Sequence, residues 1–509
     1  MKSKIFFYNV IVFIFILASS CKKNTTPPPN EIPLKKQFES ASVINTKLGH
    51  GTNYSGMFET ATGMNWVPNY ARTVANAGFK HVRIATKWER DDRSMPTPPY
   101  TINGSFMGTI KQAVDSAIRN GLYVIIDMQN HWALMDDPDG QKDRFLAQWK
   151  QISTAFKDYP DSLLFEILNE PGKKMTPEKW NVFFAAALST IREDNPDRTV
   201  LIDLGVDGLA DLPFIELPDD EHIILTPHYY RPFDLTHQGL DWSDPNSVNW
   251  VGTEWWDTEP EREVIRREFA PLKDFEEQHH IPIHIGEFGI DNVANVASRK
   301  KWATFTTRYF DQMGWSWAFF NFSIGSFGNV DPTSPSFNEY LLNAVLHDKI
   351  PDPTPYTGLS LYSSNFQSGK DGWVLNLSGG GSGNLTSSGN ALNVSISNGG
   401  TLNWHVQLSK PNIALQKGKK YHLSFKAKSN ALHNIDAFFT MTSPPYTYYY
   451  TTLPLEVTLA PGDFKQYDFV IDMHGTTDNS ARLGIDVGGP NISGANLSFT
   501  DIKIEQMIK

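Results

Sequence analysis

A chain of 509 residues exceeds what one hydrophobic core organises, so two or three domains are expected. Its formal net charge of −11 leaves no basic surface to neutralise phosphates, which argues against nucleic acid as a partner. Aromatic residues make up 13% of the chain and include 14 Trp, an excess that favours apolar faces for flat ligands such as sugar rings, beside those that pack in cores.

The first residues predict export. Lys2 and Lys4 precede an apolar segment at 5–18 that is too short to span a bilayer. The segment ends in Leu-Ala-Ser-Ser-Cys at 17–21, which resembles a bacterial lipoprotein signal, although Leu usually stands one position closer to the cysteine. Residues 1–21 are therefore expected to be a lipoprotein signal with an acylated Cys21. The alternative is an incidental cysteine in a secretory signal.

Cys21 is the only cysteine of the chain, so the mature protein forms no intramolecular disulfide. Residues 22–39 begin with a polar and proline-rich run, which predicts a flexible tether. The protein is thus expected to be a bacterial lipoprotein that meets the membrane only through its lipid, in the periplasm or at the cell surface.

Residues 40–349 alternate between short apolar runs and amphipathic helical patterns, which predicts a (β/α)8 barrel. Strands are expected at 48–56, 81–88, 123–130, 163–170, 199–206, 223–230, 282–289 and 316–322. Helical patterns occupy 65–79, 105–121, 177–193 and 261–278. A doubly wound sheet would need a glycine-rich phosphate turn after its first strand, and GHGTNYSG at 49–56 does not have that spacing.

Two carboxylates close apolar runs of this region. Glu170 ends LLFEILNE and is followed by Pro171, and Glu287 ends IPIHIGE and is followed closely by Gly289. In a β/α barrel these positions lie at the C-terminal rim, where catalytic groups collect. A helix cap or a buried ion pair would explain either glutamate alone, but catalysis better explains two at equivalent positions because a desolvated acid is costly.

Three prolines in 350–358 predict a stiff linker. Beyond it, helical periodicity gives way to short alternating strands separated by Gly, Ser and Asn turns. Residues 359–509 are therefore expected to form an all-β sandwich of the jelly-roll type.

The residues around the two glutamates resemble glycoside hydrolase family 5, retaining β-glycanases built on a β/α barrel. The matching segments are HVRIATKW (81–88), YVIIDMQN (123–130), FEILNEP (165–171), HYYRPFDLTHQG (228–239), HIGEFG (284–289) and WSWAFFNFSIGSFG (315–328). The Thr-His-Gln-Gly run at 236–239 is typical of the branch rich in endo-β-1,4-glucanases, some of which also cleave mannans.

The resemblance implies a role for each matched residue. Glu170 is the implied acid/base and Glu287 the implied nucleophile, and retaining chemistry requires their carboxyl groups to lie roughly 5–5.5 Å apart. Arg83 matches the arginine that stabilises the nucleophile. The remaining matches are Asn169, which would bind the sugar 2-hydroxyl, and His228 and Tyr230, which would orient the carboxylates. Glu166 is expected to point inside the barrel in a structural role.

Three departures from the family pattern indicate altered sugar recognition. Gln129 and Asn130 stand where the family carries two histidines, and His131 is at best a partial substitute. Phe320 stands where the family has a Trp platform, and Gly56 where relatives often have Asn. Phe still stacks on a sugar, with less area and no N–H donor.

The segment 231–260 after the sixth expected strand carries four Trp residues. Connections of this length are usually functional, so sugar contacts are expected here, although two or more of the indoles could serve only to hold the loop. Trp242, next to the His-Gln-Gly run, is the expected sugar contact.

The C-terminal domain resembles glucan-binding jelly-roll carbohydrate-binding modules through NFQSGKDGW (365–373), LNWHVQL (402–408), GKKYHLSFKAK (418–428) and LSFTDIKIE (497–505). For Trp373 and Trp404 a core position is favoured over a ligand platform. The Tyr-rich run 444–452 is expected to present some rings outward. Such folds often hold a structural calcium ion, whose ligands the sequence does not identify.

The chain is expected to be a monomeric endo-β-glycanase that acts on β-1,4-linked glucan, mixed-linkage glucan or glucomannan without cofactor or catalytic metal. Two alternatives remain. One is an endo-β-mannanase. The other is a glycan-binding surface lipoprotein whose barrel is weakly active or inactive, a reading suggested by the changed residues of the cleft.

Overall fold

A computed structural model describes residues 38–60, 64–206, 208–323, 325–330, 336–449 and 455–509. The expected signal, Cys21 and nearly all of the expected tether lie outside these residues. No helix in the described ranges is long and apolar enough to cross a membrane.

The described part of 38–349 contains nine parallel strand segments in the order β6-β5-β4-β3-β2-β1-β9-β8-β7. Segments β6 and β7 are halves of one strand interrupted at Pro227, because Leu225 bridges Ile283 while β7 pairs with β8. The sheet therefore closes on itself, and the predicted (β/α)8 barrel is confirmed. The segments are β1 (His50–Phe58), β2 (His81–Thr86), β3 (Tyr123–Asp127), β4 (Leu163–Glu166), β5 (Val200–Asp203), β6 (Ile223–Thr226), β7 (His228–Tyr229), β8 (His284–Phe288) and β9 (Ser316–Phe319).

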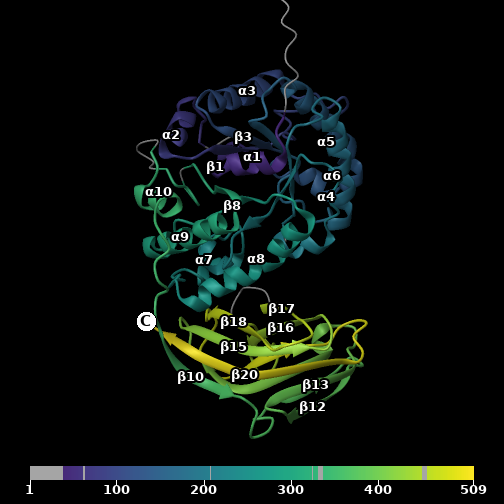
Figure 1. The fold of residues 1–509 in the computed structure, drawn as a ribbon, viewed down its shortest axis with the longest axis vertical. Helices are drawn as coiled ribbons and strands as arrows, with labels where there is room; N and C mark the ends of the chain where they lie inside the picture. The colour runs from purple at the N-terminus through teal and green to yellow at the C-terminus, as the bar shows by residue number, and fades with distance from the viewer. Residues whose placement is uncertain (1–37, 61–63, 207, 324, 331–335, 450–454) are drawn as a thin grey trace, which may run out of the picture. The chain divides into compact units, whose positions relative to one another are not determined.

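Helices surround the strands (Figure 1). Several begin at caps that the sequence encodes: Thr176 accepts the Lys179 N–H before α6, and Thr258 forms a capping box with Glu261 before α8. The helices are α1 (Ala41–Leu48), α2 (Asn69–Ala77), α3 (Gly104–Arg119), α4 (Trp132–Asp136), α5 (Pro138–Phe156), α6 (Pro177–Arg192), α7 (Phe233–Thr236), α8 (Glu259–His279), α9 (Val296–Met313) and α10 (Glu339–Leu346).

Helix α1, which the sequence analysis did not predict, closes the barrel at the N-terminal ends of the strands. Ile44 and Leu48 pack against inward-facing residues of the strands, including Leu164 and Leu201. Asn45 donates to the Ile283 carbonyl, which fixes the helix to the start of β8. The bottom of the barrel is thus sealed by apolar packing.

Successive side chains of a barrel strand point in opposite directions, one towards the helices and the next towards the barrel interior. Val82 and Ile84 of β2 belong to the apolar layer under the helices, while Arg83 between them is fully buried inside the barrel. Charged side chains therefore collect on the barrel axis, near the rim.

Residues 357–508 form two antiparallel sheets with an apolar core between them, so the predicted β-sandwich is confirmed. One sheet has the order β12-β13-β20-β15-β18 with β10 on β20, and the other has the order β11-β14-β19-β16-β17. The strands are β10 (Thr357–Ser364), β11 (Val374–Leu377), β12 (Ser382–Ser388), β13 (Ala391–Asn398), β14 (Val406–Leu415), β15 (Lys420–Ser429), β16 (His433–Thr440), β17 (Leu455–Leu459), β18 (Lys465–Asp472), β19 (Asp478–Asp486) and β20 (Ala495–Ile508).

Candidate active site

The two predicted carboxylates meet at the C-terminal rim of the barrel. Glu170 follows β4, and Glu287 lies in β8. One carboxylate oxygen from each and a ring nitrogen of His228 all lie within 4.8 Å of one another. This spacing suits a retaining pair, whose carboxyl groups stand about 5–5.5 Å apart, and not the wider gap of an inverting pair.

Glu287 receives a charged and a neutral donor. Arg83 Nη1 lies 2.6 Å from its Oε1, and the Tyr230 hydroxyl donates to its Oε2 at 2.9 Å. Arg83 is fully buried, so its positive charge acts on the carboxylate with little screening by water. These two contacts fix the orientation of the Glu287 side chain.

Arg83 is itself held by a carboxylate layer below the rim. Glu166 accepts from its Nε and Nη2 at 2.6 Å each, and Asp127 lies 3.0 Å from Nη2. Glu166 thus has the inward orientation and structural contacts expected of it. Asn53 and Asn169 also accept from the guanidinium, at 2.9 and 2.7 Å. The five hydrogen bonds to Glu166, Glu287, Asn53 and Asn169 match the five N–H donors of the guanidinium.

Glu170 pairs with His228. The His228 Nδ1 lies 2.8 Å from Glu170 Oε1, and the Glu170 side chain is 30% exposed towards solvent. Burial raises the pKa of the Glu170 carboxyl, but the hydrogen bond and positive charge of His228, with Arg83, outweigh it and the net pKa lies below its usual value. For His228 burial lowers the pKa, yet the carboxylates of Asp203, Glu287 and Glu170 raise it to about 10.

Asn169 lies beside both carboxylates. Its Oδ1 accepts from Arg83 and its Nδ2 donates to Asn130 Oδ1 at 2.8 Å. Gln129 is buried, and its Oε1 has no hydrogen-bond partner among the described residues. A buried amide oxygen without a partner is costly, and a sugar hydroxyl would satisfy it.

His131 does not replace the missing histidine pair. Its ring is fully buried, and Nδ1 accepts the Leu134 N–H as the N-cap of α4. Burial lowers the pKa of His131 to about 3, so the ring is neutral. The His131 side chain caps α4, so the suggestion that it partly substitutes for the missing histidine pair is corrected.

Aromatic rings line the cleft beside Tyr230. Phe320 and Phe327 pack edge-on against it with ring centroids 6.1 and 5.5 Å away, and Phe320 is half-buried. The ring of His237 stacks on Phe233 at 3.9 Å. Burial lowers the pKa of His237 to about 3, so this imidazole is a neutral group beside the site.

Trp242 is 69% exposed, and its ring lies edge-on to His237 at 6.1 Å, so its role as a sugar contact stays a prediction. Trp250 and Trp255 are buried and hold the 231–260 segment in place. Gln238 braces the same segment by donating to the carbonyls of Leu235 and Thr253. These contacts hold the segment against the barrel beside the candidate site.

Several polar residues of the rim were not predicted from the sequence. Asp127 and Asp203 end β3 and β5, and Asn53 lies inside β1. Each of the two aspartates ends an apolar run as the glutamates do, so the same strand-end argument could have found them. His237 lies in the recognised Thr-His-Gln-Gly run but was not singled out.

Among the residues that the structure describes, two sets of three donors are close enough to hold a metal ion, Glu166-Asp203-His228 and Glu170-His228-Glu287. Both depend on the His228 ring. Because the pKa of His228 is raised to about 10, a proton competes with any metal for that ring at neutral pH.

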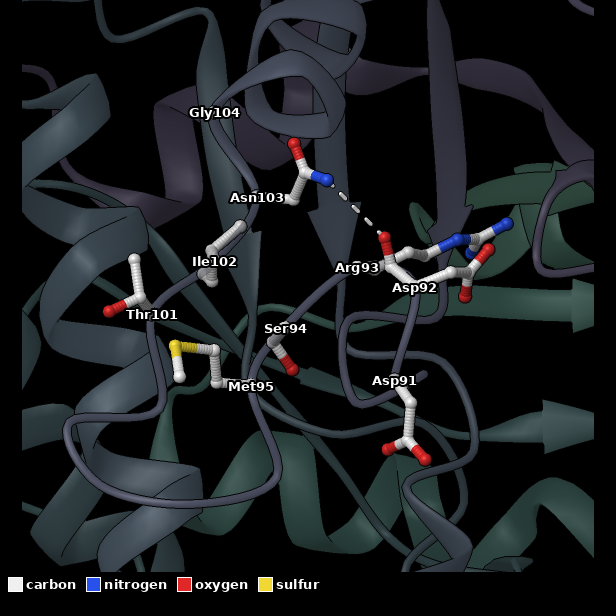
Figure 2. A pocket seen from close by; sticks show the side chains of 9 residues that line it. All are labelled: Asp91, Asp92, Arg93, Ser94, Met95, Thr101, Ile102, Asn103 and Gly104. Atoms are coloured by element: carbon white, nitrogen blue, oxygen red, sulfur yellow. Dashed lines mark hydrogen bonds between the residues drawn. The ribbon is translucent and has the colours of Figure 1, made fainter.

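A separate hollow of about 280 Å³ lies in the connection between β2 and α3, lined by 91–95 and 101–104 (Figure 2). Figure 2 shows the Asn103 amide directed at the Asp92 backbone carbonyl, and a β-bridge joins Ser94 to Ile102. None of the rim carboxylates lines this hollow, so it is distinct from the candidate active site.

The C-terminal domain has a buried polar row on the face of its second sheet that points away from the apolar core. Gln407, Asp486 and Asp436 are register partners on β14, β19 and β16. Gln407 donates to Asp486 at 2.7 Å, and Asn403 donates to Asp436. Burial raises the pKa of Asp486 to about 7.

Aromatic rings flank this polar row. Trp404, next to Asn403, is 48% exposed, so the expectation of a core position is wrong, whereas Trp373 is buried as expected. In the Tyr-rich run, Tyr446 and Tyr448 are 46% and 47% exposed, Tyr449 is buried, and 450–452 lie outside the described residues. The Arg482 guanidinium lies over the Tyr446 ring at 5.1 Å.

The family model for cellulase, glycosyl hydrolase family 5, matches residues 48–325. The chain belongs to this family. A second model, a carbohydrate binding domain, matches residues 359–492. The barrel strands and the rim carboxylates therefore lie inside the first match. The polar row Gln407-Asp486-Asp436 lies inside the second match.

Named relatives are similar to the barrel. Endoglucanase H of Acetivibrio thermocellus is 31% identical over 319 residues, covering 62% of this chain and 33% of that protein. Endoglucanase B of Ruminococcus albus is 28% identical over 294 residues, covering 52% of this chain and 68% of that protein. The chain thus spans only a third of the length of the first of these.

A crystal structure of Thermotoga maritima Cel5A in complex with mannotriose is 35% identical, with a TM-score of 0.58. The match covers 60% of this chain and all of the Cel5A chain. Cel5A has also been solved in complex with cellobiose.

Proposed function

We propose that this protein is a retaining endo-β-1,4-glucanase with Glu170 as acid/base and Glu287 as nucleophile. The observation that carries the proposal is the facing carboxylate pair, one member bound by Arg83 and Tyr230 and the other by His228. A pure binding protein needs no such pair with different electrostatic partners. The endoglucanase names of the relatives support the same reaction.

In the first step the ionised Glu287 attacks the anomeric carbon while Glu170 gives its proton to the departing glycosidic oxygen. Arg83 and Tyr230 bind the two carboxylate oxygens of this nucleophile and fix its orientation. Since the pKa of Glu170 is lowered in the ligand-free site, its proton comes from the His228 Nδ1, 2.8 Å away, when sugar displaces water from the carboxyl.

In the second step Glu170 removes a proton from water, whose oxygen attacks the anomeric carbon; the bond to Glu287 breaks, Glu287 leaves as a carboxylate, and the sugar is released with its original configuration. Asn169, which precedes Glu170 and shares the Arg83 guanidinium with Glu287, is the residue we propose to bind the 2-hydroxyl, a contact that strengthens in the transition state. Reducing-sugar release with retention of configuration, followed by NMR, tests this proposal, and an inverted product would overturn it.

We propose that the preferred substrate is mixed-linkage glucan or glucomannan, with plain cellulose hydrolysed slowly. Phe320 offers less stacking area than an indole, and Gln129 and Asn130 offer amides where the family has imidazoles. Binding of mannotriose and of cellobiose by Cel5A supports a cleft of this family that accepts both backbones. A panel of glucans and mannans measures the preference and also tests the mannanase alternative.

A second candidate function is glycan capture with slow turnover, favoured by the same three changed residues. It predicts tight binding of oligosaccharides with no reducing-sugar release from any of them. The complete acid, nucleophile and arginine set favours the enzyme.

For the C-terminal domain we propose retention on insoluble polysaccharide through the row Gln407-Asp486-Asp436 and the rings of Trp404, Tyr446 and Tyr448. Amide and carboxylate groups beside exposed rings suit the hydroxyls and apolar faces of pyranoses.

We further propose that Cys21 carries the lipid that holds the protein to a bacterial membrane, facing the periplasm or the exterior. Metabolic labelling with a palmitate analogue tests this directly. Labelling that is unchanged in Cys21→Ala would contradict it.

A further inference from the structure

Asp203 contacts both members of the Glu170–His228 pair. It ends β5 and is fully buried. Its Oδ2 accepts the backbone N–H of Glu170 at 2.9 Å and lies 3.5 Å from Nε2 of His228. That Nε2 has no hydrogen-bond partner among the described residues, while Nδ1 of the same ring lies on the Glu170 carboxyl. Asp203, Glu170 and His228 therefore lie against one another on the side of the site that donates the proton.

The backbone of Glu170 needs such support. Its φ is 45°, in the left-handed region that residues other than glycine seldom adopt. Conformations of this kind persist at functional sites when surrounding contacts hold them. Asp203 supplies one of those contacts at the Glu170 amide, while its Oδ1 accepts from Gly205 and fixes its own orientation.

The charged side chains around the Glu170–His228 pair lie in or directly after four strands. His228 faces Asp203 from β5, Glu170 after β4 and Glu287 from β8, with ring-to-carboxylate distances of 3.5, 2.8 and 3.8 Å. Glu166 of β4 also faces Asp203, and the positive charge of Arg83 from β2 lies against Glu166 and Glu287. Burial raises the pKa of Asp203 to about 7, against the lowering effect of His228.

We propose that Asp203 is a positioning residue for the acid/base: it holds the Glu170 amide and places a carboxylate behind His228, so that the catalytic proton stays in the Glu170–His228 pair at neutral pH. The inference rests on the proposed function of Glu170. Asp203 touches no sugar, and in both chemical steps the proton moves between Glu170, its His228 partner and the glycosidic oxygen or water. Removing one negative charge lowers the proton affinity of the remaining groups.

Two variants separate the charge from the amide contact. Asp203→Asn keeps an acceptor oxygen for Glu170 but removes the charge, and Asp203→Ala removes both. For Asp203→Asn we expect kcat on soluble mixed-linkage glucan to fall about tenfold or more with KM unchanged. The basic limb of its kcat/KM profile should move to lower pH by about one unit. Asp203→Ala should lose more activity.

The leaving group provides the decisive comparison. Dinitrophenyl cellobioside releases dinitrophenolate, a leaving group that needs no protonation, so its cleavage by Asp203→Asn should fall much less than glucan cleavage. An unmoved basic limb, or equal losses on both substrates, would show that Asp203 is only a structural residue. The matched control is Asp220→Asn, which loses a pair with Arg192 away from the rim and should leave both rates unchanged.

A measurement on the unmodified chain covers the case in which Asp203→Asn does not fold. The ¹⁵N spectrum of the His228 ring, assigned with His228→Gln, should show an imidazolium at pH 8, and a neutral ring there would overturn the proposal. Failure of the proposed function looks different. In that case the unmodified enzyme would release neither reducing sugar nor dinitrophenolate. Alternatively, Glu170→Gln would hydrolyse glucan as fast as the unmodified enzyme.

Discussion

Glu287 provides the most direct test at the scale of single residues. Glu287→Gln keeps the size of the side chain and the acceptor for Tyr230, but an amide is a poor nucleophile and no longer pairs with Arg83 as an anion. We expect glucan hydrolysis to fall on the order of 10⁴-fold while the thermal unfolding temperature changes little. The rate is measured by reducing-sugar release.

The control for this variant is Glu268→Gln on α8, whose carboxylate accepts from the Tyr229 hydroxyl on the outer side of the barrel. It makes the same chemical change outside the cleft and should leave hydrolysis intact. Substantial residual activity in Glu287→Gln would mean that another group is the nucleophile.

The changed sugar contacts give a second prediction at this scale. Combining Gln129→His, Asn130→His and Phe320→Trp should raise kcat/KM on unbranched β-1,4-glucan about tenfold, because stacking and hydrogen bonds at the cleaved sugar are restored. Carboxymethyl cellulose and mixed-linkage glucan are compared in parallel. If the native enzyme already hydrolyses both equally fast, these three positions do not set the preference.

At the scale of elements, the strands were predictable because parallel strands buried on both faces appear as continuous apolar runs. Glu170 and Glu287 could be placed at the rim by this pattern alone. The roles of Asp203 and His131 could not, since an acidic or imidazole side chain after a strand serves equally well as a helix cap. Helix α1 was missed because its apolar stripe packs across several strands distant in sequence, which local periodicity does not reveal.

Two histidines near α1 make the barrel sensitive to acid. His81 and His284 are fully buried with ring centroids 5.0 Å apart; the His81 Nδ1 donates to the Leu48 carbonyl, and the His284 Nδ1 bonds Ser316. Burial lowers the pKa of His81 to about 4, and burial with the nearby positive charges lowers that of His284 further.

Because the folded pKa of His81 is depressed below the unfolded value near 6.5, its contribution to stability is complete above pH 6.5 and is lost as pH falls towards 4. Going from pH 7 to pH 5 should cost the barrel about 2 kcal/mol through His81 alone. Urea unfolding at both pH values measures this, and His81→Gln should reduce the difference. An equal difference in His81→Gln, or a reduction in the exposed-site control His347→Gln, would contradict the assignment.

At the scale of the whole molecule, the second domain should alter where the enzyme acts without altering its chemistry. Trp404→Ala in the full chain should weaken retention on insoluble glucan about tenfold, since an exposed stacking surface is lost, and leave turnover of soluble substrate unchanged. A pull-down and a soluble assay are run on the same preparation. Leu359→Ala, an exposed apolar residue of the other sheet, is the control, and equal loss in both variants would place the binding surface elsewhere.

Helix α1 lies at the N-terminal ends of the barrel strands, and Glu170 and Glu287 lie at the opposite ends. The chain therefore enters the barrel at the pole that faces away from the cleft. A bulky group joined ahead of α1 would therefore lie nearer the N-terminal ends of the strands than Glu170 and Glu287, and should leave hydrolysis of a long polysaccharide unobstructed.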